Sequence, residues 1–157
     1  LVSEILKQYG FEGLPVYEEP VHSPVSTPDE AKDYSLVLNS GSRVPYYTHS
    51  KLRDLPWLNQ FMPDPVVRLH PDDAEARGIK HGDTVRLFND RGDVTMKAFV
   101  TEGIMPGVTA AQAGWTPDHV IEGSHQYLSH LTLSPAEEHY SQTNSAFNDI
   151  MIEVEKA

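Results

Sequence analysis

The basic segment at residues 40–53 carries the side chains best suited to binding an anion. It contains four basic residues and no acid, although the chain has 12 Lys and Arg against 23 Asp and Glu and a net charge of −11. It also contains a glycine, several hydroxyls and two adjacent tyrosines. Glycine allows close approach of the backbone, and hydroxyl, N–H and guanidinium groups bind phosphate. An anionic ligand site and an ordinary solvated loop both stay open.

Other chemistry-bearing residues give weaker patterns. Four of the eight histidines lie between residues 119 and 139 without the His-x-x-x-His spacing of a helical zinc site, so scattered polar histidines are the favoured interpretation. The paired acids at 72–73 and 137–138 are typical of a helix start and of solvated charge. No nucleophile elbow or phosphate loop is present, and the absence of Cys excludes thiolate ligands within this chain. We therefore predict no catalytic and no metal-ligating residue.

Short strands must position the basic segment. Apolar and polar residues alternate on both sides of Asn89-Asp90-Arg91-Gly92, which predicts a β-hairpin. The apolar and acidic alternation near the C-terminus is typical of an outer strand, and Arg68 and Arg86 are expected to face solvent. Short strands are predicted at residues 35–39, 66–69, 84–88, 94–100 and 150–155, and a second turn leads to residues 108–111.

Two brief helices complete the pattern. Apolar residues recur at helical spacing over residues 51–61, where Pro56 limits the helix, and residues 70–79 have Pro and acids at the start and Gly at the exit. Many short strands with few helices favour a small closed barrel, because closure removes exposed edges. The polar composition of residues 116–148 predicts a long loop, and such loops are usually functional.

Residues 1–33 predict a connector that leads into a domain at residues 34–157. Prolines at positions 15, 20, 24 and 28 favour an extended path along a surface, and the first residue is not Met, as expected for a piece of a longer polypeptide. The acidic charge makes nucleic acid and anionic membranes poor partners. No apolar run is long enough to predict a membrane span.

Four segments in order resemble the molybdopterin-dinucleotide-binding domain that ends the catalytic subunits of the dimethyl sulfoxide reductase and formate dehydrogenase superfamily. Residues 38–43 with 47–50 resemble its strand–Gly-Arg–His opening, and residues 64–107 are similar to its barrel core. Residues 142–149 resemble its closing loop, and the Pro-rich residues 14–20 resemble its approach segment. Together these segments place the resemblance over nearly the whole chain.

The resemblance implies a mainly β fold, a six-stranded double-psi β-barrel with short helices and a long polar loop. It implies two copies of molybdopterin guanine dinucleotide as the cofactor, with Mo or W held by upstream domains. By match to the motifs, the implied cofactor-binding residues are Ser40, Gly41, Ser42, Arg43, His49, Ser50, Trp115, Gln142 and Asn144.

The first hypothesis is therefore a cofactor-holding C-terminal domain of a molybdenum or tungsten oxidoreductase, not an enzyme by itself. The resemblance implies upstream domains of the same polypeptide as partners and allows iron–sulfur electron-transfer subunits. One alternative is a stand-alone double-psi barrel that binds peptides or partner proteins, and another is a small self-sufficient barrel enzyme such as a decarboxylase. The sequence leaves the substrate, the metal and the compartment open.

Overall fold

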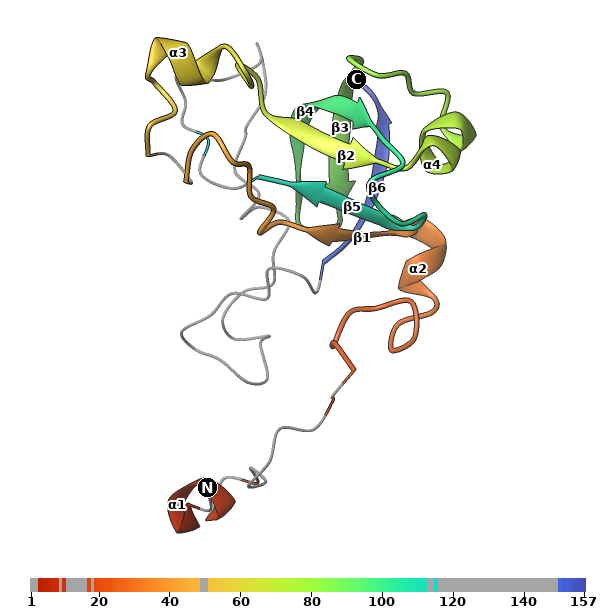
Figure 1. Ribbon diagram of the computed structural model, residues 1–157. Coiled ribbons are helices and arrows are strands. Elements are labelled where there is room, and N and C mark those ends of the chain that lie inside the picture. Colours follow the sequence, from red (N-terminus) through yellow and green to blue (C-terminus); the bar gives the residue numbers. More distant parts are fainter. Residues whose placement is uncertain are drawn as a thin grey trace.

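The computed structural model describes residues 3–8, 10, 17, 19–48, 51–112, 115 and 150–157. Within these ranges six strands close into a barrel in the order β1-β5-β2-β4-β3-β6 (Figure 1). The strands are β1 (Leu36–Asn39), β2 (Val66–Leu69), β3 (Thr84–Asn89), β4 (Gly92–Val100), β5 (Val108–Ala111) and β6 (Met151–Lys156). The helices are α1 (Glu4–Gln8), α2 (Glu30–Asp33), α3 (Pro56–Asn59) and α4 (Pro71–Ala76). The predicted strands and the predicted barrel are confirmed.

Two ladders of the barrel are parallel, β1 with β5 and β2 with β4, and the other four are antiparallel. The closure depends on β6, which pairs with β1 on one side and with β3 on the other. The prediction of an outer strand at residues 150–155 is therefore wrong. The alternation there separates the barrel interior from its exterior, with Ile152 and Val154 buried and Glu155 exposed.

The core lies inside the barrel, where alternate residues of each strand point inward. Burying an aliphatic side chain contributes about 1.5–3 kcal/mol, so this interior supplies most of the stabilisation of the barrel. The strand residues that form it are Leu36, Leu38, Val67, Leu69, Val85, Leu87, Val94, Met96, Ala98, Ala111, Ile152 and Val154.

Local sequence explains the turns that join these strands. Asn89 ends β3, and its Oδ1 accepts a hydrogen bond from the Arg91 backbone N–H at 3.0 Å, which closes the predicted hairpin turn. Pro71 begins α4, and the preceding His70 accepts from the Asp72 N–H through Nδ1 at 3.2 Å. Gly78 then leaves the helix with a φ of 64°, a conformation that glycine adopts without steric cost. The predicted helix at 70–79 is thus confirmed over its first two-thirds.

The predicted helix at 51–61 is shorter in the structure. It is reduced to α3, which begins at Pro56, because proline is tolerated in the first turn of a helix but not in its interior. None of the helices in the described ranges has the length and apolar character needed to cross a bilayer. The predicted long loop at 116–148 lies outside the described residues.

Candidate functional site

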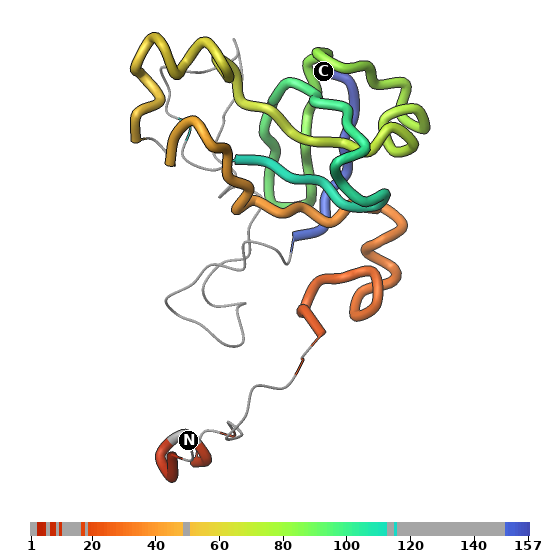
Figure 2. Tube along the Cα trace, in the orientation of Figure 1, coloured from red at the N-terminus to blue at the C-terminus, as the bar shows by residue number. Residues whose placement is uncertain are grey.

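Residues 40–43 leave the barrel where β1 and β5 both end. These strands are parallel, so their C-terminal ends lie side by side, and Gly41 forms a β-bridge with Gln112 just beyond β5. Ser40 is buried, and the Gly41 N–H donates to Asn39 Oδ1 at 3.0 Å, which bends the chain out of the strand. In Figure 2 this segment and the chain around α3 extend from the same end of the barrel.

The side chains of this turn offer hydrogen-bond donors and positive charge. Arg43 is exposed. Arg68 of β2 faces outward as expected, but it is half-buried and its Nη1 lies 3.4 Å from Ser42 Oγ. Two guanidinium groups and a hydroxyl therefore lie on or beside the turn. Strand alternation predicts that Arg68 points outward, but it gives no sign that it meets Ser42.

A buried cation packs behind the turn. Arg53 is 1% exposed, and its Cζ lies 3.8 Å from the ring centroid of Trp115 and 4.7 Å from that of Tyr47. The two rings meet edge to face, with centroids 6.4 Å apart and planes at 87°. The Tyr47 hydroxyl donates to Gln112 Oε1 at 3.3 Å. We call Tyr47, Arg53 and Trp115 the Arg53 cluster.

Burial perturbs both ionisable groups of the cluster. It raises the pKa of the Tyr47 phenol, although the positive charge of Arg53 opposes the shift. Burial also lowers the pKa of Arg53, opposed by Tyr47 and by the nearby Asp54. A guanidinium keeps its proton at neutral pH despite such a shift, so the cluster holds a buried positive charge behind the turn.

The structure thus brings together Ser40, Gly41, Ser42 and Arg43 at one end of the barrel and places Trp115 in the adjoining cluster. The other predicted site residues, His49, Ser50, Gln142 and Asn144, lie outside the described residues. Sequence reasoning missed the contacts of Tyr47, Arg53 and Gln112. The basic composition of residues 40–53 drew attention to Arg53, but nothing in the pattern indicated that it is buried.

Exposed apolar side chains lie on the chain between this turn and β2. Tyr46 stacks on Phe61, with ring centroids 4.9 Å apart and planes at 15°. Leu52, Trp57 and Phe61 are each more than half exposed. Large aromatic side chains exposed together are typical of a surface that another part of a protein covers.

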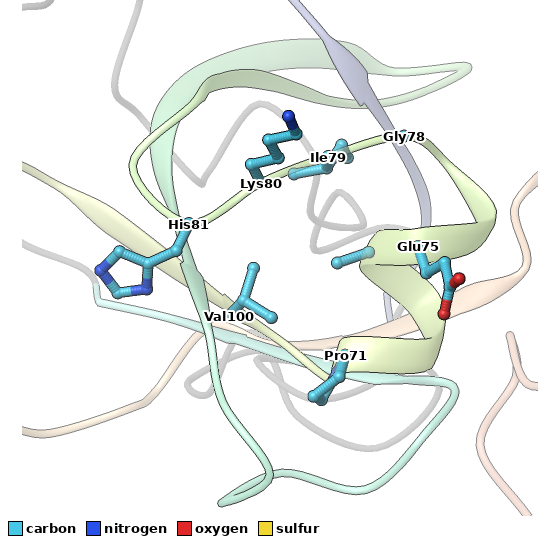
Figure 3. Close-up of a pocket in the computed structure, with 8 residues that line it drawn as sticks. Pro71, Glu75, Gly78, Ile79, Lys80, His81 and Val100 are labelled. Atoms are coloured by element: carbon cyan, nitrogen blue, oxygen red, sulfur yellow. The ribbon is translucent and has the colours of Figure 1, made fainter.

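A separate pocket of about 520 Å³ lies between α4, the chain that follows it and the last residue of β4 (Figure 3). Its lining is mainly carbon, with Glu75, Lys80 and His81 supplying the polar groups. It is lined by Pro71, Ala74, Glu75, Gly78, Ile79, Lys80, His81 and Val100. Among the predicted site residues that the structure describes, none lines it.

Comparison with known proteins gives consistent matches. Residues 36–151 match the family model described as the molydopterin dinucleotide binding domain. The chain is 32% identical over 129 residues to dopamine dehydroxylase of Eggerthella lenta and 36% identical over 109 residues to a putative dimethyl sulfoxide reductase catalytic subunit of Halobacterium salinarum. These alignments cover 82% and 69% of this chain but 12% of each relative, so the chain spans about an eighth of their length.

A solved structure has the same fold. The acetylene hydratase from Pelobacter acetylenicus superposes with a TM-score of 0.84 at 22% sequence identity. The superposition covers 99% of this chain and 23% of that one. The barrel described above is therefore a fold found within a much larger protein.

Proposed function

This chain belongs to the molybdopterin dinucleotide-binding domain family of the dimethyl sulfoxide reductase superfamily, and from that premise we propose that residues 40–43 hold part of its cofactor. The predictions of the family, the fold class and molybdopterin guanine dinucleotide as the cofactor are confirmed. The match over residues 36–151 favours a cofactor-binding domain of a molybdopterin oxidoreductase over the stand-alone partner-binding module.

The donors at the end of β1 suit the anionic part of such a cofactor. A dinucleotide carries a diphosphate, and arginine binds phosphate through paired N–H groups. Arg43 is exposed at the turn, and Arg68 lies close enough to Ser42 to face the same ligand. The single observation that carries the proposal is this gathering of basic side chains in a chain whose net charge is −11.

Each proposed residue has a role that its placement allows. Gly41 presents backbone without a side chain, Ser42 and Arg43 present donors, and Ser40 is buried where it supports the turn. The proposal also includes the predicted contacts with the cofactor by His49, Ser50, Gln142 and Asn144. It further includes a position for Trp115 at the edge of the cofactor. The cofactor supplies the redox chemistry when bound, while the chain binds and orients it.

The remaining partners are proposed on the same basis. Residues 1–33 would connect an upstream catalytic region, which supplies the ligand to Mo or W, to the domain at residues 34–157. The exposed Leu52, Trp57 and Phe61, on the chain between the turn and β2, support coverage by such a region. Iron–sulfur electron-transfer subunits are further proposed partners. The chain alone is expected to show no redox turnover.

The test uses the complete enzyme that contains this domain. Arg43→Ala should lower the molybdenum or tungsten and the guanine nucleotide bound per polypeptide, whereas Arg86→Ala should not. Arg86 of β3 pairs at the surface with Asp93 and Glu155, at 3.1 and 2.9 Å, so it controls for loss of a positive charge. Equal cofactor content in both variants would place the cofactor elsewhere.

A further inference from the structure

We propose, on the basis of the function above, that Arg53 is a positioning residue for the cofactor site. It does not reach the ligand, because it is 1% exposed. Instead it joins the two segments that leave the barrel at this end. Tyr47 belongs to the segment after β1, Trp115 to the segment after β5, and the Arg53 guanidinium packs against both rings.

The contacts of the cluster continue into the ligand turn. Tyr47 donates to Gln112, and Gln112 forms the β-bridge with Gly41. A displacement of Arg53 therefore changes the support of Tyr47, and through Gln112 it loosens the backbone of Gly41. Gly41 lies between Ser40 and Ser42, in the turn proposed to meet the diphosphate.

The backbone before Arg53 adopts an unfavourable conformation that brings this side chain inward. Leu52 has a φ of 69°, and among the described residues it is the only non-glycine residue with a positive φ. A side chain in this region meets steric resistance that glycine avoids. Lys51 and Leu52 are exposed, whereas Arg53 is buried immediately after them. Strain of this kind persists only where the surrounding structure enforces it, and here the enforced result is the buried guanidinium.

The cluster favours a planar cation at position 53. Aromatic faces attract a positive charge, and the attraction grows when water is excluded. A guanidinium also stacks flat on a ring, which an ammonium cannot do. Lysine should therefore retain part of the function, because it keeps the charge, and methionine should retain little, because it keeps only the length and bulk.

The experiment compares Arg53→Lys and Arg53→Met in the complete enzyme that contains this domain. The rate at which the enzyme loses bound guanine nucleotide and metal on dilution is measured, with Arg86→Met as the matched control. We expect Arg53→Met to lose the cofactor roughly tenfold faster than wild type. The rate of loss for Arg53→Lys should lie within about threefold of wild type, and the control should not change. Recovery by lysine separates a charge-dependent positioning role from simple filling of space.

A second measurement tests the cluster without the cofactor. The chain contains two tryptophans, so Trp57→Phe leaves Trp115 as the single fluorophore. In this background Arg53→Met should shift the Trp115 emission spectrum and increase its quenching by acrylamide, whereas Arg53→Lys should have the smaller effect. In the complete enzyme, Tyr47→Phe removes only the hydroxyl that donates to Gln112 and should speed cofactor loss by roughly threefold. This variant replaces Arg53→Met in the test if Arg53→Met does not fold.

The outcomes distinguish the two proposals. The positioning role is wrong if Arg53→Met retains the cofactor as long as wild type while Arg43→Ala loses it. Tyr47→Phe takes the place of Arg53→Met if that variant does not fold. In this outcome the proposed cofactor site is still supported. If Arg43→Ala also retains it, the site itself is misplaced. An unchanged Trp115 spectrum in Arg53→Met would overturn the cluster directly.

Discussion

Glu153→Gln should destabilise the barrel, because the Glu153 carboxylate joins three elements. Glu153 lies in β6, and its carboxylate accepts hydrogen bonds from Arg77, the residue just after α4. The donors are Arg77 Nε at 2.5 Å and Arg77 Nη2 at 3.1 Å. It also accepts from Ser35 Oγ at 2.8 Å, immediately before β1, and from the Val154 N–H at 2.9 Å. Glutamine keeps the shape of the side chain but removes its negative charge. Its N–H₂ group replaces one carboxylate oxygen and cannot accept a hydrogen bond from the donors that surround Glu153.

The size of the effect follows from burial. The Arg77 and Glu153 side chains are 16% and 23% exposed, so water screens the pair only in part. Breaking a fully buried pair costs about 3–5 kcal/mol, and a hydrogen bond to a charged group contributes about 1.5–3 kcal/mol. We expect Glu153→Gln to lower the free energy of unfolding by about 2–3 kcal/mol, with a fall in Tm of about 5–10 °C for a chain of this size. Glu155→Gln on the same strand is the control, since its pair with Arg86 is half exposed and should contribute about 0–1 kcal/mol.

The dependence on pH gives the effect a signature. Burial alone would raise the pKa of Glu153, but the hydrogen bonds from Arg77, the Val154 N–H and Ser35 hold it below its usual value of 4.5. A lowered folded-state pKa means that the ionised carboxylate stabilises the fold above the unfolded-state value and that this contribution is lost as pH falls through the folded-state pKa. Urea unfolding at pH 7 and near pH 3 should therefore show a difference between wild type and Glu153→Gln that shrinks in acid. A difference that stays constant, or grows, would refute the charge-based explanation.

Two further predictions concern the ligand end of the barrel. Leu52→Gly should raise the free energy of unfolding by up to about 1 kcal/mol, because glycine accepts the positive φ without steric cost. The control Lys51→Gly should lower the free energy of unfolding by about 0.5–1 kcal/mol. Urea titration measures both values, and an equal loss of stability in the two variants would contradict the prediction. Asn144→Ala should leave the Tm of the chain nearly unchanged while lowering the guanine nucleotide bound by the complete enzyme, and a large fall in Tm would instead identify Asn144 as a structural turn residue.

Much of the barrel could be predicted from the sequence because strand periodicity is a local property. Alternation at residues 84–88 and 94–100 separates inward from outward side chains, and the turn at residues 89–92 joins them. The closure could not be predicted this way. Alternation at residues 150–155 indicates which side chains point inward, but the pattern is the same for an edge strand and for one paired on both sides, as β6 is. The double-psi topology came from the family resemblance.

The site divides in a similar way. Composition revealed the basic turn, since Arg43 and its neighbours stand out in an acidic chain. The Arg53 cluster was missed because arginine is rarely buried, so a sequence gives it an exposed position by default. Its burial depends on Trp115, which lies 62 positions later in the chain and meets Arg53 only because β1 and β5 end side by side. Contacts that depend on strand order leave no trace in local spacing.

The turn after β1 is basic in an acidic chain, and this contrast bears on how an anionic cofactor would be received. Arg43 lies on this turn and Arg68 lies beside it, whereas Arg53 is buried behind it. A diphosphate approaching a chain of net charge −11 is repelled by most of its surface. The basic turn would therefore attract the diphosphate as well as contact it, and neutralising Arg43 should slow association at low salt more than at high salt, since exposed charges act over about a Debye length.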